Sequence, residues 1–123
     1  MSNHVAAIEM DGGAEKPLGF GFGVAPGPQA DRALAKAREI GRLLQSIGAD
    51  SMTAGGGGGD ISPVMEAGVP GFGMNTVGVH YFDWHHTPSD TVDKIKPEEF
   101  QQNVAALAVL SYVLADMPDR LIE

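Results

Sequence analysis

The sequence contains no cysteine. This absence excludes disulfide bonds, thiolate metal sites and a thiol nucleophile, so any metal site must use His, Asp or Glu side chains. No apolar run approaches the ~20 residues that a membrane-spanning helix needs. The opening residues also lack the basic and apolar regions of a secretory signal peptide. We therefore expect no membrane partner.

Basic residues are scarce as well: 8 Lys and Arg against 16 Asp and Glu give a formal net charge of -8. A protein that binds nucleic acid needs a basic face to neutralise phosphates. The basic residues between 32 and 42 alternate with Asp31 and Glu39, which is typical of a solvated helix face. We expect no nucleic-acid partner.

What the chain does contain is a regular alternation of elements within 123 residues, enough for one domain with one core. Short apolar segments predict strands at residues 4–10, 51–54 and 69–75. Apolar periodicity and terminus signals predict helices at residues 29–47, 60–67 and 97–117. Strands that alternate with helices predict an α/β fold of three layers (αβα), with a mostly parallel sheet and flanking helices.

The remaining segments predict loops. Residues 12–28 are rich in glycine and proline and predict a long loop, with room for a short extended piece at residues 20–24. Residues 76–93 predict a second loop. In the last helix, residues 104–115 are nearly all small or apolar, which predicts burial on more than one side.

A run of five glycines, Gly55–Gly59, precedes Asp60. It fits a calcium-binding repeat, but that motif works in tandem copies and this chain has a single one. It also lacks the Gly-Lys-Ser/Thr of a phosphate-binding P-loop. Two interpretations stay open: a structural turn into a helix that Asp60 caps, or a turn that lines a ligand site at the carboxyl edge of a parallel sheet.

The first predicted strand ends in Glu9-Met10-Asp11-Gly12-Gly13. Alternation along a strand places Glu9 and Asp11 on the same side, with Asp11 at the exit of the strand. A carboxylate beside glycines suits a contact to zinc or to a hard cation. Taken alone, an Asp that caps a loop is the more common case.

Two adjacent histidines, His85 and His86, precede the polar turn Thr87-Pro88-Ser89-Asp90-Thr91. Neutral imidazole is the commonest zinc ligand, and a ligand ring needs further hydrogen bonds to fix its orientation. The turn offers hydroxyl and carboxylate groups for that purpose. The pattern by itself leaves both metal ligation and a surface role open.

Together these segments resemble the co-catalytic zinc aminopeptidase family, and within it the plasma glutamate carboxypeptidase-like branch. The resemblance rests on the stretch from Ala67 to Gly71, on His86-Thr87 followed by Asp90-Thr91, and on the strand that ends at Asp11. It extends over residues 1–123. By this resemblance the chain is a single partial domain, the C-terminal half of a zinc exopeptidase domain.

The resemblance implies a role for particular residues. Asp11 would be a ligand to one of two zinc ions, and His86 a ligand to the other. Ile61 stands where the family more often has a histidine. The resemblance and the strand and loop positions together predict these site-lining residues: Glu9, Gly59, Asp60 and His85.

The family's site also needs residues that have no counterpart here. They are another zinc-binding His, a bridging Asp and a Glu-Glu pair that supplies a ligand and the general base, all upstream of the strand at residues 4–10. Glu98-Glu99 opens the last helix and fits the helix dipole instead. A catalytic zinc takes about three protein ligands, so we assign no catalytic residue and expect weak or absent zinc binding by this chain alone.

Three functions compete at this point. The chain is a fragment of a dinuclear zinc exopeptidase, whose parent hydrolyses the terminal bond of a peptide substrate with metal-activated water, and is inactive alone. Alternatively, it is a non-catalytic module that self-associates through an exposed sheet edge. The third possibility, a complete site assembled from two copies, ranks last because association supplies no missing residue type. A homo-oligomer is the expected state.

Overall fold

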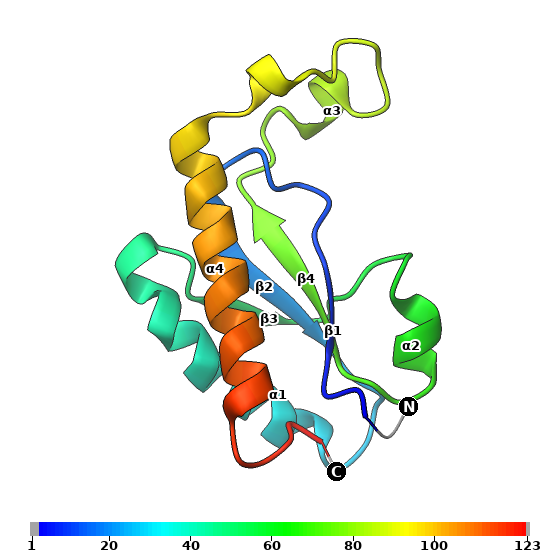
Figure 1. Ribbon diagram of the computed structural model, residues 1–123. Coiled ribbons are helices and arrows are strands. Elements are labelled where there is room, and N and C mark those ends of the chain that lie inside the picture. Colours follow the sequence, from blue (N-terminus) through cyan, green and yellow to red (C-terminus); the bar gives the residue numbers. More distant parts are fainter. Residues whose placement is uncertain (1–2, 123) are drawn as a thin grey trace.

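The computed structural model describes residues 3–122. One four-stranded sheet has the order β1-β4-β2-β3 (Figure 1). β1 is parallel to β4 and β2 is parallel to β3, whereas β2 and β4 are antiparallel, so two of the three pairings are parallel. The strands are β1 (Ala7–Glu9), β2 (Pro17–Gly23), β3 (Ser51–Ala54) and β4 (Gly71–Thr76).

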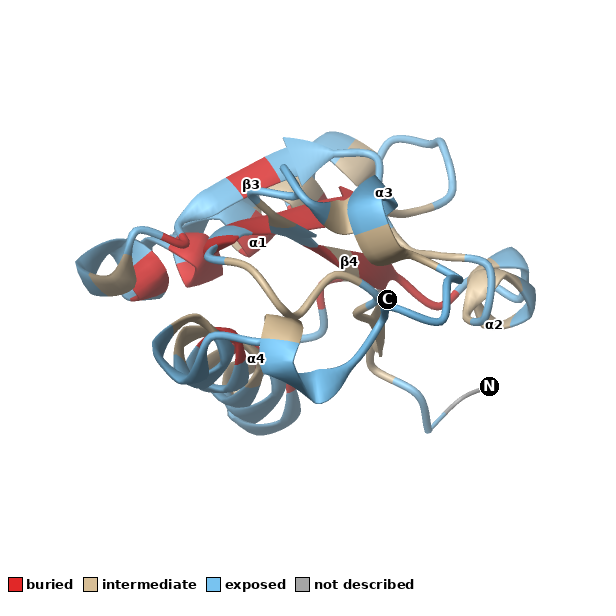
Figure 2. Ribbon diagram, turned by 90° about the horizontal axis from the view of Figure 1, so that it is seen from above, coloured by how far each residue is buried: buried red, intermediate tan, exposed pale blue. Residues whose placement is uncertain are grey.

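Helices flank the sheet. α1 and α4 pack on one face, and the short α2 lies beside the strands at the other end of the molecule (Figures 1 and 2). This mixed, mostly parallel sheet with flanking helices confirms the predicted three-layer α/β class. The helices are α1 (Ala30–Gly41), the 3-10 helix η1 (Arg42–Ile47), α2 (Ser62–Glu66), α3 (Tyr81–Trp84), the 3-10 helix η2 (Val92–Lys94) and α4 (Pro97–Asp116).

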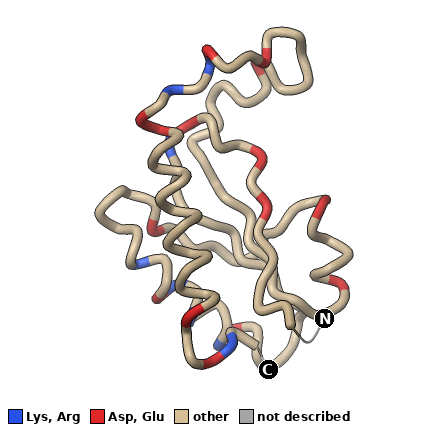
Figure 3. The backbone as a smooth tube through the Cα atoms, in the orientation of Figure 1, with Lys and Arg blue, Asp and Glu red and all other residues tan. Residues whose placement is uncertain are grey.

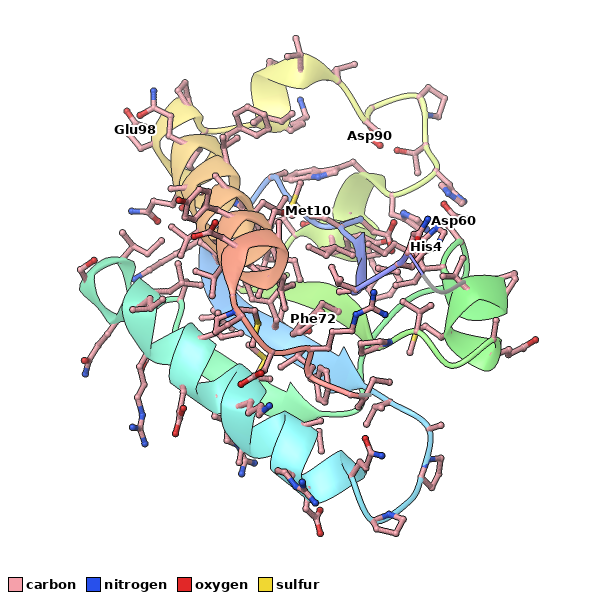
Figure 4. All side chains as sticks on the ribbon, turned by 60° about the horizontal axis from the view of Figure 1, so that its bottom comes forward. His4, Met10, Asp60, Phe72, Asp90 and Glu98 are labelled. Atoms are coloured by element: carbon pink, nitrogen blue, oxygen red, sulfur yellow. The ribbon has the colours of Figure 1, made fainter. Side chains whose placement is uncertain are left out.

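The core lies between the sheet and the pair α1 and α4. Every second side chain of β2 and β4 points into it, as the period of a strand requires. The rings of Phe20 and Phe72 meet edge to face with centroids 6.5 Å apart, and Phe22 lies 5.0 Å from Phe72. Figure 4 shows Phe72 near the centre of the molecule. Ala37 of α1 and Leu110 of α4 are fully buried against these rings. The burial of this apolar surface stabilises the fold.

The opposite face of the same strands consists mainly of glycine. The glycine segment, Gly55–Gly59, crosses this face, and its backbone packs directly on the backbones of β2 and β4. A Cβ on Gly56 would overlap the backbone of Gly21, and a Cβ on Gly73 would lie 2.6 Å from the carbonyl oxygen of Gly57. A side chain does not fit where the segment crosses the strands. The close contact therefore needs glycine on both sides, in the strands and in the segment.

β2 corrects the loop predicted at residues 12–28, in which the short extended piece at residues 20–24 overlaps a longer strand. The strand runs Pro17–Gly23 and lies inside the sheet, paired on both sides. Glycine at alternate positions weakens a strand, so the sequence of β2 gives a weak strand signal. The phenylalanines between those glycines nevertheless follow the strand period and all point into the core.

The direction of β3 corrects a second expectation. Because β3 is parallel to β2 and therefore opposite to β1 and β4, its carboxyl end lies where those two strands begin. The glycine segment does not leave the sheet at the edge where Asp11 follows β1. The segment runs across the face of the sheet, from β2 over β4 toward β1. At the end of this path, Gly58 lies against the carboxylate of Glu9.

Two further expectations change. The loop predicted at residues 76–93 contains α3 and the start of η2. α4 buries a single stripe, whereas Val104 and Tyr112 on its outer side are 49% and 68% exposed, so burial on more than one side is wrong. That outer side carries no charged residue between the two ends of the helix (Figure 3). Within residues 3–122, no helix combines the length and the hydropathy of a membrane span.

Candidate functional site

An open cleft of about 380 Å³ lies between the ends of β1 and β4, the glycine segment and α3. Gly56 and Gly57 form part of its wall, and Tyr81 and Phe82 stand at its rim. Glu9 and Asp11 are the charged residues among those that line it. The cleft is therefore acidic and attracts cations rather than anions.

Glu9 is held in place by backbone hydrogen bonds. Its Oε2 accepts the N–H groups of Asp60 at 2.9 Å and of Ile61 at 3.1 Å. Ile61 is the N-cap of α2, so a side chain from β1 satisfies amides that the start of a helix leaves without partners. A Cβ on Gly58 would overlap the Glu9 carboxylate. Glu9 lines the cleft and also ties the glycine segment to β1.

The predicted capping of α2 by Asp60 is wrong. The N-cap is Ile61 and has no side-chain cap, and Asp60 takes part through its backbone N–H. Its carboxylate is exposed at the outer end of the glycine segment (Figure 4). Gly59 is exposed too, and no atom lies within 4 Å of where its Cβ would be.

Asp11 follows β1 after Met10 and is exposed. It lines the 380 Å³ cleft and also a smaller cavity of about 80 Å³. The smaller cavity is shared with Glu15, His85 and Asp90. The fold thus brings Asp11 and one of the two histidines to the same place, although a large part of the chain separates them.

The histidine segment, residues 80–94, comprises α3, a turn and η2. His85, not His86, lines the cavity with Asp11. The ring of His86 stacks on His85 with centroids 3.8 Å apart, and His85 stacks on Tyr81 at 4.5 Å. His86 is exposed and has a backbone φ of 57°, in the left-handed region that residues other than glycine rarely adopt.

Hydrogen bonds fix the turn after the histidines. Thr87 Oγ1 donates to the Trp84 carbonyl oxygen at 2.7 Å and lies 2.9 Å from Ser89 Oγ. Thr91 Oγ1 donates to the Ser89 carbonyl oxygen at 3.3 Å. These bonds join the turn to the end of α3 and to itself, and none of those described reaches the His86 ring, whose described contact is the stacking on His85.

Asp93 ends the segment with a perturbed carboxyl group. The Lys94 ammonium, 2.6 Å from Asp93 Oδ2, lowers the pKa of Asp93 from its usual 3.8 to about 2, and the Thr91 hydroxyl acts in the same direction. This pair lies on the surface, away from the cavity that Asp11 and His85 share.

A zinc site needs about three protein ligands for each ion. Between residues 3 and 122, no three His, Asp or Glu side chains are grouped so that they could hold a metal ion. The residues present therefore do not fit a complete zinc centre, and no chemical step through zinc follows from this chain.

The model of peptidase family M28 matches residues 1–111. The chain belongs to peptidase family M28. Over 121 residues, this M28 chain is 36% identical to carboxypeptidase Q of Xenopus laevis and 33% to that of Homo sapiens. It is 32% identical to carboxypeptidase Q of Mus musculus. Each alignment covers 98% of this chain and 25% of the relative, so the chain spans about a quarter of the length of these curated relatives. No solved structure gives a significant match.

Several residues that line the cleft or the smaller cavity of this M28 chain were not predicted. Tyr81, Phe82 and Trp84 lie in a stretch that was expected to be a loop and that forms α3, a helix without a buried residue. Glu15 lines the smaller cavity but lies among glycine and proline, where nothing in the sequence distinguishes it.

Proposed function

We propose that this M28 chain supplies part of the active site of a dinuclear zinc exopeptidase and is inactive by itself. Asp11 is a ligand to one zinc ion and His86 to the other. The remaining ligands and the general base come from outside these 123 residues. Residues 1–123 form one partial domain, and the substrate of the whole enzyme is a peptide. The proposed site-lining residues are Glu9, Gly59, Asp60 and His85.

The observation that carries this proposal is the shared cavity of Asp11 and His85 in a chain of the M28 family. Asp11 follows the carboxyl end of β1, and His86 is the next residue after His85. The acidic lining of the adjoining cleft favours cations. Both proposed ligands therefore belong to segments that meet at one end of the sheet.

The proposed inactivity has a physical basis in the same residues. Each zinc ion would have one ligand from this chain, where about three are needed. A general base must be free to take a proton from the attacking water. Glu9, the other carboxylate at the cleft, already accepts two backbone N–H groups.

Hydrolysis assays and zinc binding test the proposal separately. With added Zn²⁺, the chain should not cleave dipeptide or aminoacyl substrates above the blank. Clear turnover that His86→Ala abolishes would contradict the proposed inactivity. In an NMR titration, Zn²⁺ should shift the Asp11 amide and the His86 ring signals, weakly. Asp11→Asn should remove the former response and His86→Ala the latter. His4→Ala, at a histidine that lines a different cavity, is the matched control and should retain both.

The alternative is a non-catalytic module that associates with a second copy of itself. Its support is that β1 and β3 are edge strands of the described sheet, each paired on one side. An unpaired edge is a template for pairing with another chain. Sedimentation or light scattering measures the mass in solution. A folded chain that stays strictly monomeric at high concentration counts against this alternative.

A further inference from the structure

We propose that Glu15 is a positioning residue: it ties the loop after Asp11 to the histidine segment and so sets where the two proposed ligands lie relative to each other. The inference rests on the proposed function, in which Asp11 and His86 bind metal. Its structural part, the link itself, can be measured without metal.

The backbone of Glu15 is anchored to α4. Asn103 Nδ2 donates to the Glu15 carbonyl oxygen at 2.7 Å and to the Glu99 carbonyl oxygen at 2.8 Å. Asn103 is fully buried, in a stripe that continues with Ala106 and Leu110. Since both neighbours of Nδ2 are acceptors, the NH2 group must face them, which determines the orientation of the amide.

Asn103 is the polar residue of this buried stripe. Its Nδ2 joins the Glu15 carbonyl oxygen to the first turn of α4, where Glu99 lies. A buried side chain of the long helix therefore anchors the loop that follows Asp11.

The side chain of Glu15 extends to the start of α3. Its Oε2 accepts the backbone N–H of His80 at 3.3 Å, and His80 is the N-cap of that helix. His80 in turn contacts two residues of α3. Its Nδ1 lies 2.7 Å from Asp83 Oδ2, and its ring stacks on the Trp84 ring with centroids 5.4 Å apart. Glu15 thereby connects α4 to the helix that leads directly into His85 and His86.

The other side-chain hydrogen bonds described for the histidine segment join its residues to one another. The bond from His80 to Glu15 leads out of the segment. Glu15 also lines the cavity that Asp11 and His85 share. Its backbone belongs to the loop that begins at Asp11, so a displacement of Glu15 moves both sides of that cavity.

Amide hydrogen exchange of the ¹⁵N-labelled chain tests the link with matched variants. In Glu15→Ala, protection of the His80 amide should fall about two- to tenfold, the effect of losing one hydrogen bond. Signals should shift on both sides, at Asp11 and at Trp84. Glu15→Gln keeps an acceptor oxygen at the same reach and should restore them, whereas the shorter Glu15→Asp should behave like Ala. The Gly55 amide, which donates to the Phe22 carbonyl oxygen at 2.9 Å, is the unaffected reference.

Three results would overturn the inference: unchanged His80 protection in Glu15→Ala, equal effects of Gln and Ala, or shifts confined to the loop. An unchanged urea midpoint shows that global unfolding is not the cause. If Ala does not fold, the comparison of Gln with Asp decides. Zn²⁺ titration and hydrolysis by the wild-type chain are scored separately: Zn²⁺ shifts confined to residues other than Asp11 and His86, or clear peptide turnover by the chain alone, contradict the proposed function and leave the exchange result for Glu15 standing.

Discussion

The glycine segment and the histidine segment border the same cleft, but different forces hold them. Gly55–Gly59 lies with its backbone on the backbones of β2 and β4 and is tied to β1 through Glu9. Residues 80–94 stack on one another and hydrogen-bond within their own turn. The Glu15 side chain accepts a hydrogen bond from this segment, and the segment shares a cavity with the loop after Asp11.

This difference shows which side of the cleft has its position fixed by packing and which side does not. Close-packed backbone leaves a segment one position, because any displacement creates overlap or a void. A segment with exposed, local contacts opens at a lower free energy than the core. The glycine wall and Glu9 therefore belong to the defined part of the site, while His86 belongs to the part whose place depends on few contacts.

The largest expected effect comes from filling the glycine crossing. Gly56→Ala places a Cβ on the backbone of Gly21, which cannot move aside without breaking the sheet. We expect a loss of about 3 kcal/mol in the free energy of unfolding, the upper end for overpacking. Urea denaturation followed by circular dichroism measures it.

Gly59→Ala is the matched control for that substitution. Gly59 has no neighbour within 4 Å of the Cβ position and does not have a positive φ. Its replacement should change stability by less than about 1 kcal/mol, in the stabilising direction, since alanine restricts the unfolded chain. Equal losses in both variants would show that the glycine segment is not held by backbone contact.

A smaller effect is expected from removing the tie between β1 and α2. Glu9→Ala takes the acceptor from the amides of Asp60 and Ile61 and should cost about 1 kcal/mol, as the loss of a helix cap does. Hydrogen exchange should rise at these two amides and not in the histidine segment. Glu9→Gln, which keeps one acceptor oxygen, should lie between wild type and Ala.

The same carboxylate allows a sharper test. A Cβ on Gly58 overlaps the Glu9 side chain and has no nearer obstacle. Gly58→Ala should therefore destabilise the wild-type chain but be tolerated in the Glu9→Ala background, a non-additive pair. Additive losses would contradict the proposed contact between the glycine segment and β1.

The same contrast explains what could be predicted from the sequence. The apolar periods of α1 and α4 and the short strand β3 are local signals, and these elements lie close to where they were expected. β2 was predicted as no more than a short extended piece because its glycines serve a contact with a segment distant in sequence. The direction of β3 depends on β2, so the course of the glycine segment was missed with it.

The candidate site divides in the same way. Strand alternation and the glycines beside it suffice to single out Asp11, and the adjacent histidines mark His85 and His86. Nothing local indicates that Glu9 would accept the amides of Asp60 and Ile61. Glu15 was missed for the same reason, because its two partners, His80 and Asn103, come from distant parts of the chain.

The smallest effect concerns the exposed end of the histidine segment. Because the folded pKa of Asp93 is lowered from 3.8 to about 2, its interaction with Lys94 stabilises the fold above pH 4. This contribution is lost as the pH falls from about 4 to about 2, since the unfolded chain then binds the proton more readily. Asp93→Asn should remove it, and the difference in urea midpoint from wild type should vanish near pH 2. ¹³C titration of the Asp93 carboxyl measures the pKa directly, and Lys94→Met should raise it toward the usual value. If the pKa of Asp93 stays near 2 in Lys94→Met, the hydrogen bond from the Thr91 hydroxyl, and not Lys94, lowers it.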